Sequence, residues 1–99
     1  MKEKIEQFNF RGQYVTYNWN WLDNDIFELE FGDGDFTDSE NNDYFLHFEY
    51  HVNDNQWIIE VWWEYDNINI NELYKCDADE YITEKEIEEV KKFAEQFMD

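Results

Sequence analysis

The sequence contains no proline, a single cysteine and, between Gly12 and Tyr74, no lysine or arginine. One cysteine, Cys76, excludes a disulfide bond within the chain and indicates an intracellular protein. The N-terminal segment MKEKIEQF lacks the apolar stretch of a signal peptide, and no segment approaches the length and hydrophobicity of a membrane span. We therefore expect a cytoplasmic protein without a membrane partner.

The missing basic residues leave the chain strongly acidic. It has 26 Asp and Glu against 7 Lys and Arg, which gives a formal net charge of −19. Solubility of a small domain needs a net charge of only about 2–8 in magnitude, and repulsion between like charges opposes folding. Fifteen of the acids lie in the span 12–74, whereas all the bases lie towards the two ends. This distribution indicates that the acids serve an interaction rather than solubility.

The composition also excludes a disordered acidic tail. Of the 99 residues, 42% are hydrophobic and 21% are aromatic, which is enough apolar surface for a modest core. No linker, internal repeat or change of composition divides the chain. We therefore expect residues 1–99 to form a single domain.

Alternation of apolar and polar residues predicts several β-strands. Segments 13–21, 26–31 and 44–65 alternate in this way, and NININ at 67–71 suggests one more short strand. In the first two segments, the residues predicted to face the core are Val15, Tyr17, Trp19, Trp21, Phe27, Leu29 and Phe31. Phe8 and Phe10 fit either an earlier strand or a short N-terminal helix that carries Ile5 and Phe8.

The segment 44–65 is predicted to be a β-hairpin. If Asp54-Asn55 forms a two-residue turn, the numbers of paired residues sum to 109. The pairs facing the core are then Tyr44/Tyr65, Leu46/Trp63, Phe48/Val61, Tyr50/Ile59 and Val52/Trp57. The pairs facing outward are Phe45/Glu64, His47/Trp62, Glu49/Glu60 and His51/Ile58. Because like charges directly opposite each other destabilise a sheet, the Glu49/Glu60 pair indicates a functional face.

The C-terminal segment predicts an α-helix. Thr83 and Glu86 have the spacing of a capping box, with Ile82 and Ile87 as its hydrophobic staple. The apolar stripe of the helix consists of Ile87, Val90, Phe93, Ala94 and Phe97. The predicted fold class is α+β: an antiparallel meander of four to six strands with this helix packed on one face.

The acidic segment GDGDFTDSENND at 32–43 offers alternate carboxylates, which are calcium ligands. An EF-hand loop that began at Asp33 would need glycine at its sixth position, where Asp38 stands. The segment is also flanked by predicted strands rather than by helices. We therefore expect a solvated acidic loop rather than a calcium site.

Zinc and catalysis have little support in the sequence. His47, Glu49 and His51 lie on one strand face at spacings of about 6.8 Å, and two of them with Glu60 could bind zinc. This spacing is loose, and no third strong ligand is evident. The sequence also has no nucleophile elbow, phosphate loop or HExxH motif. We expect no metal, no cofactor and no enzymatic activity.

The outward-facing acids of the strands are predicted to form a regular array. Carboxylates at i and i+2, such as Glu28 and Glu30, are separated by about 6.8 Å, which is about two nucleotide rises along one nucleic-acid strand. A rigid sheet with such an array can replace phosphates in a basic groove, with Trp62, Phe45, Ile58 and Ile26 as apolar anchors. The residues predicted to bind the partner are Glu28, Glu30, Asp33, Asp35, Asp38, Glu40, Glu49, Glu60, Trp62 and Glu64.

In its size, its acidic middle free of Lys and Arg, its single-domain organisation and its lack of catalytic motifs, the chain resembles the small acidic inhibitors of bacteriophages and mobile elements. These include DNA-mimic anti-restriction and anti-CRISPR proteins and inhibitors of uracil-DNA glycosylase. The resemblance implies a protein that binds a host enzyme acting on nucleic acid and blocks its basic groove, without binding nucleic acid itself. We expect a monomer or homodimer in the bacterial cytoplasm.

Three other interpretations stay open. An immunity protein that neutralises a basic nuclease toxin uses the same electrostatics. Halophilic adaptation also produces acidic, lysine-poor surfaces, although the many large aromatic residues and the bases at both ends argue against it. The third is an acidic domain whose partner has no relation to nucleic acid.

Overall fold

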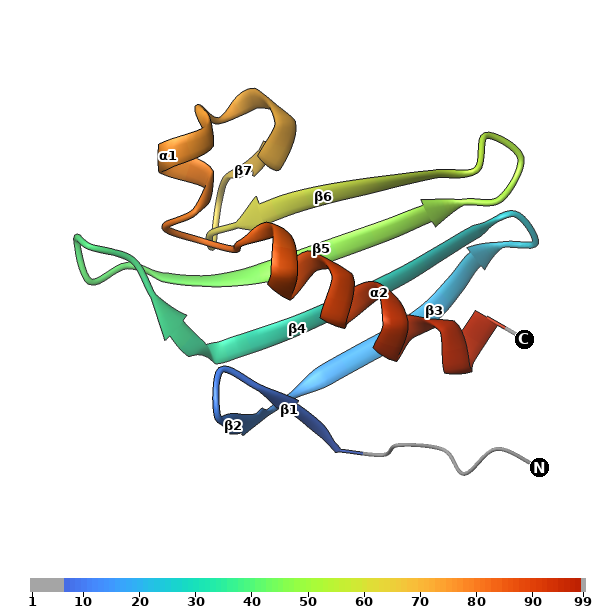
Figure 1. Ribbon diagram of the computed structural model, residues 1–99, viewed down its shortest axis with the longest axis horizontal. Coiled ribbons are helices and arrows are strands. Elements are labelled where there is room, and N and C mark those ends of the chain that lie inside the picture. The colour runs from blue at the N-terminus through green and yellow to red at the C-terminus, as the bar shows by residue number, and fades with distance from the viewer. Residues whose placement is uncertain (1–6, 99) are drawn as a thin grey trace.

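The computed structural model describes residues 7–98 and is built around an antiparallel sheet of five strands (Figure 1). The strands are β3 Tyr17–Asp23, β4 Ile26–Thr37, β5 Asp43–His51, β6 Gln56–Trp62 and β7 Asn67–Asn69. They lie in the sheet in the order in which they occur along the chain, so the sheet is a meander. With a C-terminal helix packed on one face, the predicted α+β class is confirmed.

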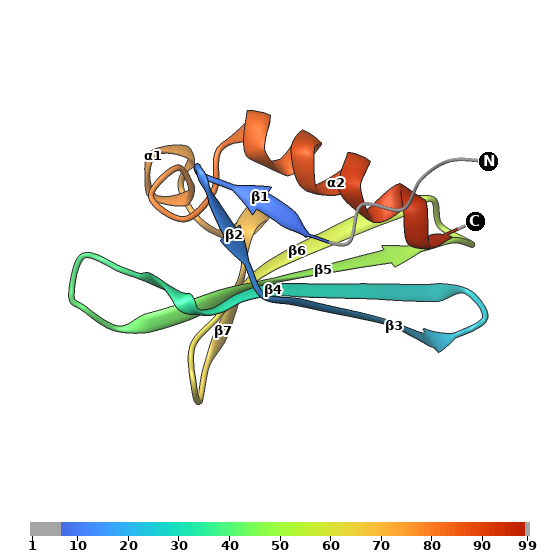
Figure 2. The same cartoon turned by 90° about the horizontal axis from the view of Figure 1, so that it is seen from below.

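This helix, α2 Glu84–Met98, crosses one face of the sheet (Figure 2). It begins with the predicted capping box, because the Thr83 N–H donates to Glu86 Oε1 at 3.0 Å and the Glu86 N–H donates to Thr83 Oγ1 at 3.2 Å. Two shorter elements before it were not predicted from the sequence. They are the 3₁₀ helix η1 Ile70–Glu72 and the one-turn helix α1 Lys75–Ala78.

A two-stranded hairpin lies on the same side of the sheet as α2 (Figure 2). It consists of β1 Phe8–Phe10 and β2 Gln13–Val15. The turn residues Arg11 and Gly12 both have positive φ, 57° and 78°, as a type I′ turn requires. Phe8 and Phe10 therefore belong to a strand, and the alternative of a helix at Phe8 is wrong, whereas Ile5 lies outside the described residues.

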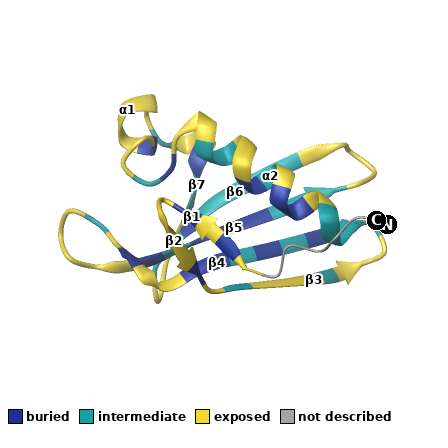
Figure 3. Cartoon of the chain, turned by 60° about the horizontal axis from the view of Figure 1, so that its bottom comes forward, coloured by how far each residue is buried: buried dark blue, intermediate teal, exposed yellow. Residues whose placement is uncertain are grey.

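The core fills the space between the sheet, α2 and the hairpin, and buried positions recur along β4 and β5 (Figure 3). The largest fully buried side chains are Phe10, Phe27, Leu29, Phe31, Leu46, Phe48, Val61, Ile82 and Val90. Aromatic rings from distant segments meet here: Phe8 stacks on Phe93 with centroids 4.3 Å apart. Each such apolar side chain contributes about 1.5–3 kcal/mol on burial, so this core opposes the self-repulsion of the acidic surface.

The predicted faces of β5 and β6 are mostly correct, but the predicted register is wrong by two residues. Leu46 pairs with Val61 and Phe48 with Ile59, so paired numbers sum to 107 rather than 109. A shift of two residues leaves every side chain on its face. The outward pairs change accordingly: Phe45 lies opposite Trp62, His47 opposite Glu60, Glu49 opposite Ile58 and His51 opposite Gln56.

The register differs because the hairpin closes with the four-residue turn 52–55 instead of the predicted two-residue turn. The Val52 N–H donates to the Asp25 carbonyl at 2.8 Å, which ties this turn to the neighbouring β3–β4 turn. Asn55 has a φ of 49°, which asparagine tolerates. Two residues predicted to face the core are consequently exposed, Val52 at 47% and Tyr65 at 92%.

The segment 13–21 forms two strands rather than one. The chain leaves the hairpin after Val15 and enters the main sheet at Tyr17, so β2 pairs with β1 and β3 pairs with β4. Thr16 marks the break, and its N–H donates to Asp35 Oδ2 at 3.2 Å. A side-chain acceptor thus replaces the strand partner that this N–H would otherwise require.

The acidic segment 32–43 is mainly strand rather than the expected loop. β4 continues through Gly32 to Thr37, and only residues 38–42 connect it to β5. Gly32 has a φ of 88°, and a Cβ there would lie 2.0 Å from the Phe36 ring. This glycine bends the strand and shifts its register, so that both Phe31 and Phe36 reach the core.

The short NININ segment forms the predicted strand only in part. β7 pairs with β6 through Ile68 opposite Val61, and Ile70 is buried in η1 rather than in the strand. None of the helices within residues 7–98 is long and apolar enough to cross a membrane.

Candidate functional site

The face of the sheet opposite α2 gathers carboxylates from three adjacent strands around one histidine. Strand alternation sends Glu28 and Glu30 of β4, His47 and Glu49 of β5, and Glu60 of β6 to this face. In the observed register Glu28 lies opposite Glu49, and His47 lies between Glu30 and Glu60. We call these five residues the His47 cluster.

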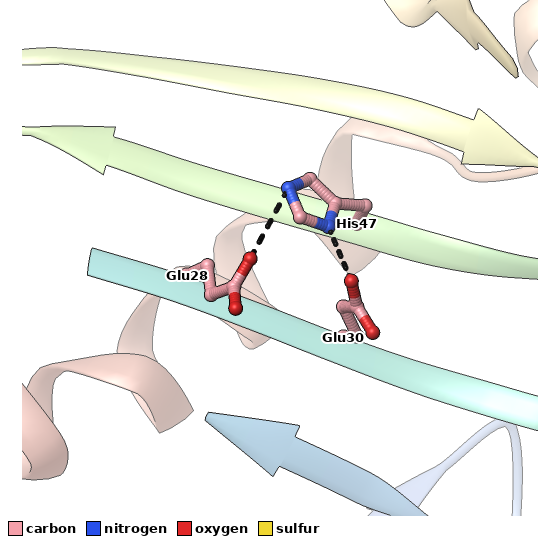
Figure 4. A group of neighbouring side chains, drawn as sticks. All are labelled: Glu28, Glu30 and His47. Atoms are coloured by element: carbon pink, nitrogen blue, oxygen red, sulfur yellow. Dashed lines mark hydrogen bonds and ion pairs between the residues drawn. The ribbon is translucent and has the colours of Figure 1, made fainter. Parts of the chain in front are cut away.

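His47 is buried, with 5% of its surface exposed, although the sequence placed it on a solvent-facing strand face. Its Nδ1 lies 3.0 Å from Glu30 Oε1, within hydrogen-bond distance (Figure 4). Its Nε2 lies 3.9 Å from Glu28 Oε2 and 3.9 Å from Glu49 Oε2, which is beyond hydrogen-bond distance. The two ring nitrogens therefore have different environments.

Aromatic rings and an amide complete the surroundings of this cluster. The Trp62 ring lies 5.2 Å from the His47 ring and 5.9 Å from the Phe45 ring. Asn67 Nδ2 donates to Glu60 Oε2 at 2.9 Å. Trp62, Phe45 and Ile58, predicted as outward anchors, do lie on this face, but all three are half-buried.

The carboxylates of the cluster repel one another in a partly desolvated setting. Burial raises the pKa of Glu28, the charges of Glu30 and Glu49 raise it further, and His47 opposes the shift. Two overlapping sets of described residues bring possible metal-ligating atoms within 4.8 Å of one another: Glu28, Glu30 and His47, and His47, Glu49 and Glu60.

A second acidic feature runs along three contiguous hollows, with volumes of about 290, 350 and 780 Å³. Asp33 and Phe45 line both the first and the second hollow, and Asp43 and Glu64 line both the second and the third. We call the carboxylate residues that line these hollows the acidic track. They are Glu30, Asp33, Asp38, Glu40, Asp43, Glu64, Asp66 and Glu80.

The third and largest hollow combines acids with aromatic rings. Trp63, Tyr65 and Tyr81 line it together with acidic side chains, and Tyr65 is almost fully exposed. The sequence prediction missed this hollow because it placed Tyr65 in the core and did not select Asp43, Asp66 or Glu80. The sequence signal that could have found it is the turn-forming pair Asp66-Asn67. It follows soon after β6, which ends at Trp62, so Tyr65 lies outside the strand.

Two of the predicted partner-binding acids, Asp35 and Asp38, accept hydrogen bonds from backbone N–H groups. Asp35 Oδ2 accepts hydrogen bonds from the Thr16 N–H at 3.2 Å and from Thr16 Oγ1 at 3.3 Å. Asp38 Oδ1 accepts from the Glu40 and Asn42 N–H groups, and Asp38 Oδ2 accepts from Trp63 Nε1 at 3.1 Å. The hydrogen bond from the Asn42 backbone is the largest cause that lowers the pKa of Asp38; desolvation opposes it, and the hydrogen bonds from Trp63 and the Glu40 backbone add to the lowering.

The other predicted residues fall into two groups. Glu28, Glu49 and Glu60 lie in the His47 cluster, whereas Asp33, Glu40 and Glu64 are exposed along the acidic track. Glu30 belongs to both features, and therefore joins them. From the sequence, these acids were predicted to form one array. In the structure they are divided between a half-buried cluster and an exposed track.

Within residues 7–98, basic side chains do not line the three hollows. No Lys or Arg is among their lining residues in the part of the chain that the structure describes. The Arg11 guanidinium packs over the adjacent rings of Phe10 and Phe36, 4.9 and 4.8 Å from their centroids, and pairs with Glu86 at 2.8 Å. Its charge is therefore used inside the fold and does not neutralise the track.

Comparison of the chain with protein-family models, with curated proteins and with solved structures gives no match. The inference of function therefore rests on the side chains described above.

Proposed function

We propose that this protein is an inhibitor that mimics nucleic acid: it binds the basic groove of a host DNA- or RNA-binding enzyme and blocks the access of nucleic acid. The observation that carries the proposal is the acidic track, whose hollows have no lining Lys or Arg among residues 7–98. Contacts to phosphates dominate the affinity of such grooves. A row of carboxylates on a fixed surface offers the same charge.

The rigidity of the track supports this proposal. Asp43 of β5 pairs with Thr37 of β4, and the Asp33 carbonyl accepts a hydrogen bond from Thr16 Oγ1 at 3.3 Å, so both backbones are held in place. The connecting loop is held by Asp38, which accepts hydrogen bonds from the N–H groups of Glu40 and Asn42 at 2.9 and 2.8 Å. A preordered charged surface loses less conformational entropy on binding than a flexible acidic tail does.

The aromatic rings of the third hollow support a partner rich in arginine. Trp63, Tyr65 and Tyr81 line this hollow beside carboxylates. Arginine stacks on aromatic faces and pairs with carboxylates, and it is a common residue in nucleic-acid-binding grooves. The hollow thus offers both kinds of contact that such a side chain makes.

The test compares two variants that remove equal charge. Asp33→Asn, Glu40→Gln, Asp43→Asn and Glu64→Gln together neutralise exposed acids of the track and leave the His47 cluster intact. The control variant combines Asp54→Asn, Glu72→Gln, Glu89→Gln and Glu95→Gln, which are exposed residues that do not line the three hollows. Each protein is immobilised and exposed to nuclease-treated bacterial lysate at low salt.

We expect the wild type and the control variant to retain an enzyme that acts on nucleic acid, and the track variant to associate with it more slowly. Labelled DNA or RNA should displace the retained enzyme. Binding should also weaken as salt rises, because charges are screened beyond about 8 Å at 0.15 M. Equal retention by all three proteins, or a ternary complex with nucleic acid still in the groove, would contradict mimicry. Capture of a nuclease toxin whose groove stays accessible would instead favour an immunity protein.

A further inference from the structure

We propose that the His47 cluster binds one divalent transition-metal cation of the zinc class, with His47 Nε2, Glu49 and Glu60 as its protein ligands. This site is separate from the exposed part of the acidic track. It does not depend on the proposed inhibitory function.

The hydrogen bond at Nδ1 prepares His47 for this role. Glu30 Oε1 lies 3.0 Å from Nδ1, so a neutral imidazole donates its Nδ1–H to this carboxylate and keeps the lone pair on Nε2. Histidines that bind metals have this arrangement, in which a carboxylate fixes the tautomer and the orientation of the ring. Because His47 is buried and covered by Trp62 at 5.2 Å, the ring has little freedom to turn.

The separations between His47 Nε2 and the neighbouring carboxylate oxygens fit a cation bound between them. Glu28 Oε2 and Glu49 Oε2 both stand 3.9 Å from Nε2. Both separations are too long for a hydrogen bond. Ligand atoms around tetrahedral zinc are about 3.3 Å apart, given metal–ligand distances of about 2.0–2.1 Å. Small side-chain movements therefore bring these groups to a coordination distance.

The other two ligands come from the same strand and from its neighbour. Ligand atoms of His47, Glu49 and Glu60 lie within 4.8 Å of one another. Asn67 Nδ2 donates to Glu60 Oε2 at 2.9 Å, which orients that carboxylate as outer hydrogen bonds orient metal ligands. Glu28, on the other side of Nε2, provides a further carboxylate. The structure thus brings Glu60 of β6, which the sequence offered as a possible zinc ligand, next to His47 and Glu49 of β5.

The donor set selects the class of cation. One imidazole nitrogen and a few carboxylates suit zinc and related transition metals, whereas calcium takes six to eight oxygen ligands. A dication also offsets repulsion among the four carboxylates around His47. A cation between Glu49 and Glu60 would explain why like charges are concentrated on a half-buried face.

The test uses the full chain without an affinity tag, stripped with EDTA, dialysed and titrated with ZnCl₂ at pH 7.5 in a calorimeter. We expect one zinc ion per chain. Glu49→Gln and Glu60→Gln each keep the side-chain shape and should raise the Kd by more than about 10-fold, and Glu30→Gln should raise it by about 10-fold. The control is Glu64→Gln, which removes an equal charge from an exposed position outside the cluster and should leave the Kd unchanged.

A second measurement observes the ligand directly. In ¹⁵N NMR spectra of the histidine rings, zinc should shift Nε2 of His47 and leave its Nδ1 protonated. Circular dichroism of each variant verifies that the fold is retained. Weak binding of several zinc ions that Glu64→Gln reduces as much as Glu49→Gln does would show counterions on an acidic surface and overturn the proposal. An unchanged Nε2 signal at saturating zinc would also overturn it.

Discussion

Glu28 of β4 lies directly opposite Glu49 of β5, on the half-buried face of the sheet. Directly opposed like charges destabilise an antiparallel pair. The Glu49/Glu60 pair predicted from the sequence does not form, because Glu49 faces Ile58 on β6. The fold nevertheless places two carboxylates opposite each other, between β4 and β5 instead of between β5 and β6. One oxygen of each lies 3.9 Å from His47 Nε2.

Removing one charge of this pair should stabilise the protein in the presence of EDTA. We expect Glu28→Gln to raise the free energy of unfolding by about 0.5 kcal/mol, because like charges directly opposite each other destabilise a sheet and cross-strand pairs change stability by about 0.2–1 kcal/mol. Urea unfolding followed by tryptophan fluorescence measures the change. Glu89→Gln, on the exposed side of α2, serves as the control for lowering the net charge. A lower free energy of unfolding in Glu28→Gln would contradict this expectation. It would show that the attraction between Glu28 and His47 outweighs the repulsion from Glu30 and Glu49.

Gly32 and Gly34 form a matched pair for testing the bend in β4. Both have positive φ, 88° and 81°. A Cβ at Gly32 would lie 2.0 Å from the Phe36 ring, whereas a Cβ at Gly34 would have no atom of the described residues within 4 Å beyond its chain neighbours. Gly34→Ala should cost only the backbone penalty of about 1 kcal/mol. Gly32→Ala adds overpacking of about 1–3 kcal/mol. Thermal unfolding of both variants checks this order, and equal losses would contradict the close approach of Phe36.

Arg11 should not be replaceable by lysine. Its guanidinium packs over two adjacent phenylalanine rings, pairs with Glu86 at 2.8 Å, and also donates to Tyr44 Oη and to the Tyr81 carbonyl. Lysine keeps the charge, but it has no planar guanidinium that could stack on the rings and donate hydrogen bonds to several acceptors at once. We expect Arg11→Lys to lower the free energy of unfolding by about 2 kcal/mol.

The control for this substitution is Lys92→Arg, which changes an exposed base of α2 and should be neutral. Denaturant unfolding compares the two variants under the same conditions. A loss below about 0.5 kcal/mol in Arg11→Lys, the usual range for surface substitutions, would mean that charge alone matters at position 11.

The contribution of Glu86 should depend on pH. Burial by itself raises the pKa of this carboxyl, but hydrogen bonds from Arg11 and from the Thr83 backbone outweigh it and lower the pKa below the ordinary value of 4.5. A lowered pKa in the folded state stabilises the protein above the unfolded pKa, and this stability is lost as the pH falls through the folded value.

The unfolding free energies of the wild type and of Glu86→Gln should therefore differ most above about pH 5. The difference should shrink as the pH is lowered towards 3. Measuring the difference cancels the titration of the many other acids that the two proteins share. A difference that grows with acidification would contradict the assigned direction of the shift.

Several features of the fold were determined by local sequence. The alternation of residues 44–50 assigned Leu46 and Phe48 to the core face, and the Thr83–Glu86 spacing fixed the start of α2. The acidic nature of the surface was also evident, because no base occurs between Gly12 and Tyr74. The strand faces and the helix start depend on neighbours within about four residues along the chain, which is the range that periodicity and capping rules cover, and the acidity follows from the composition alone.

Other features were decided only by the tertiary structure. The register of β5 and β6 follows from the four-residue turn 52–55, whose Val52 N–H donates to Asp25 in a different turn, and a shift of two residues leaves the alternation unchanged. The extension of β4 through Gly32 depends on packing against Phe36. His47 is buried because β4 brings Glu28 and Glu30 to one side and β6 brings Glu60 and Trp62 to the other. Sequence spacing specifies which face of its own strand a side chain occupies, whereas the partners across strands follow from turns and packing that bring distant segments together.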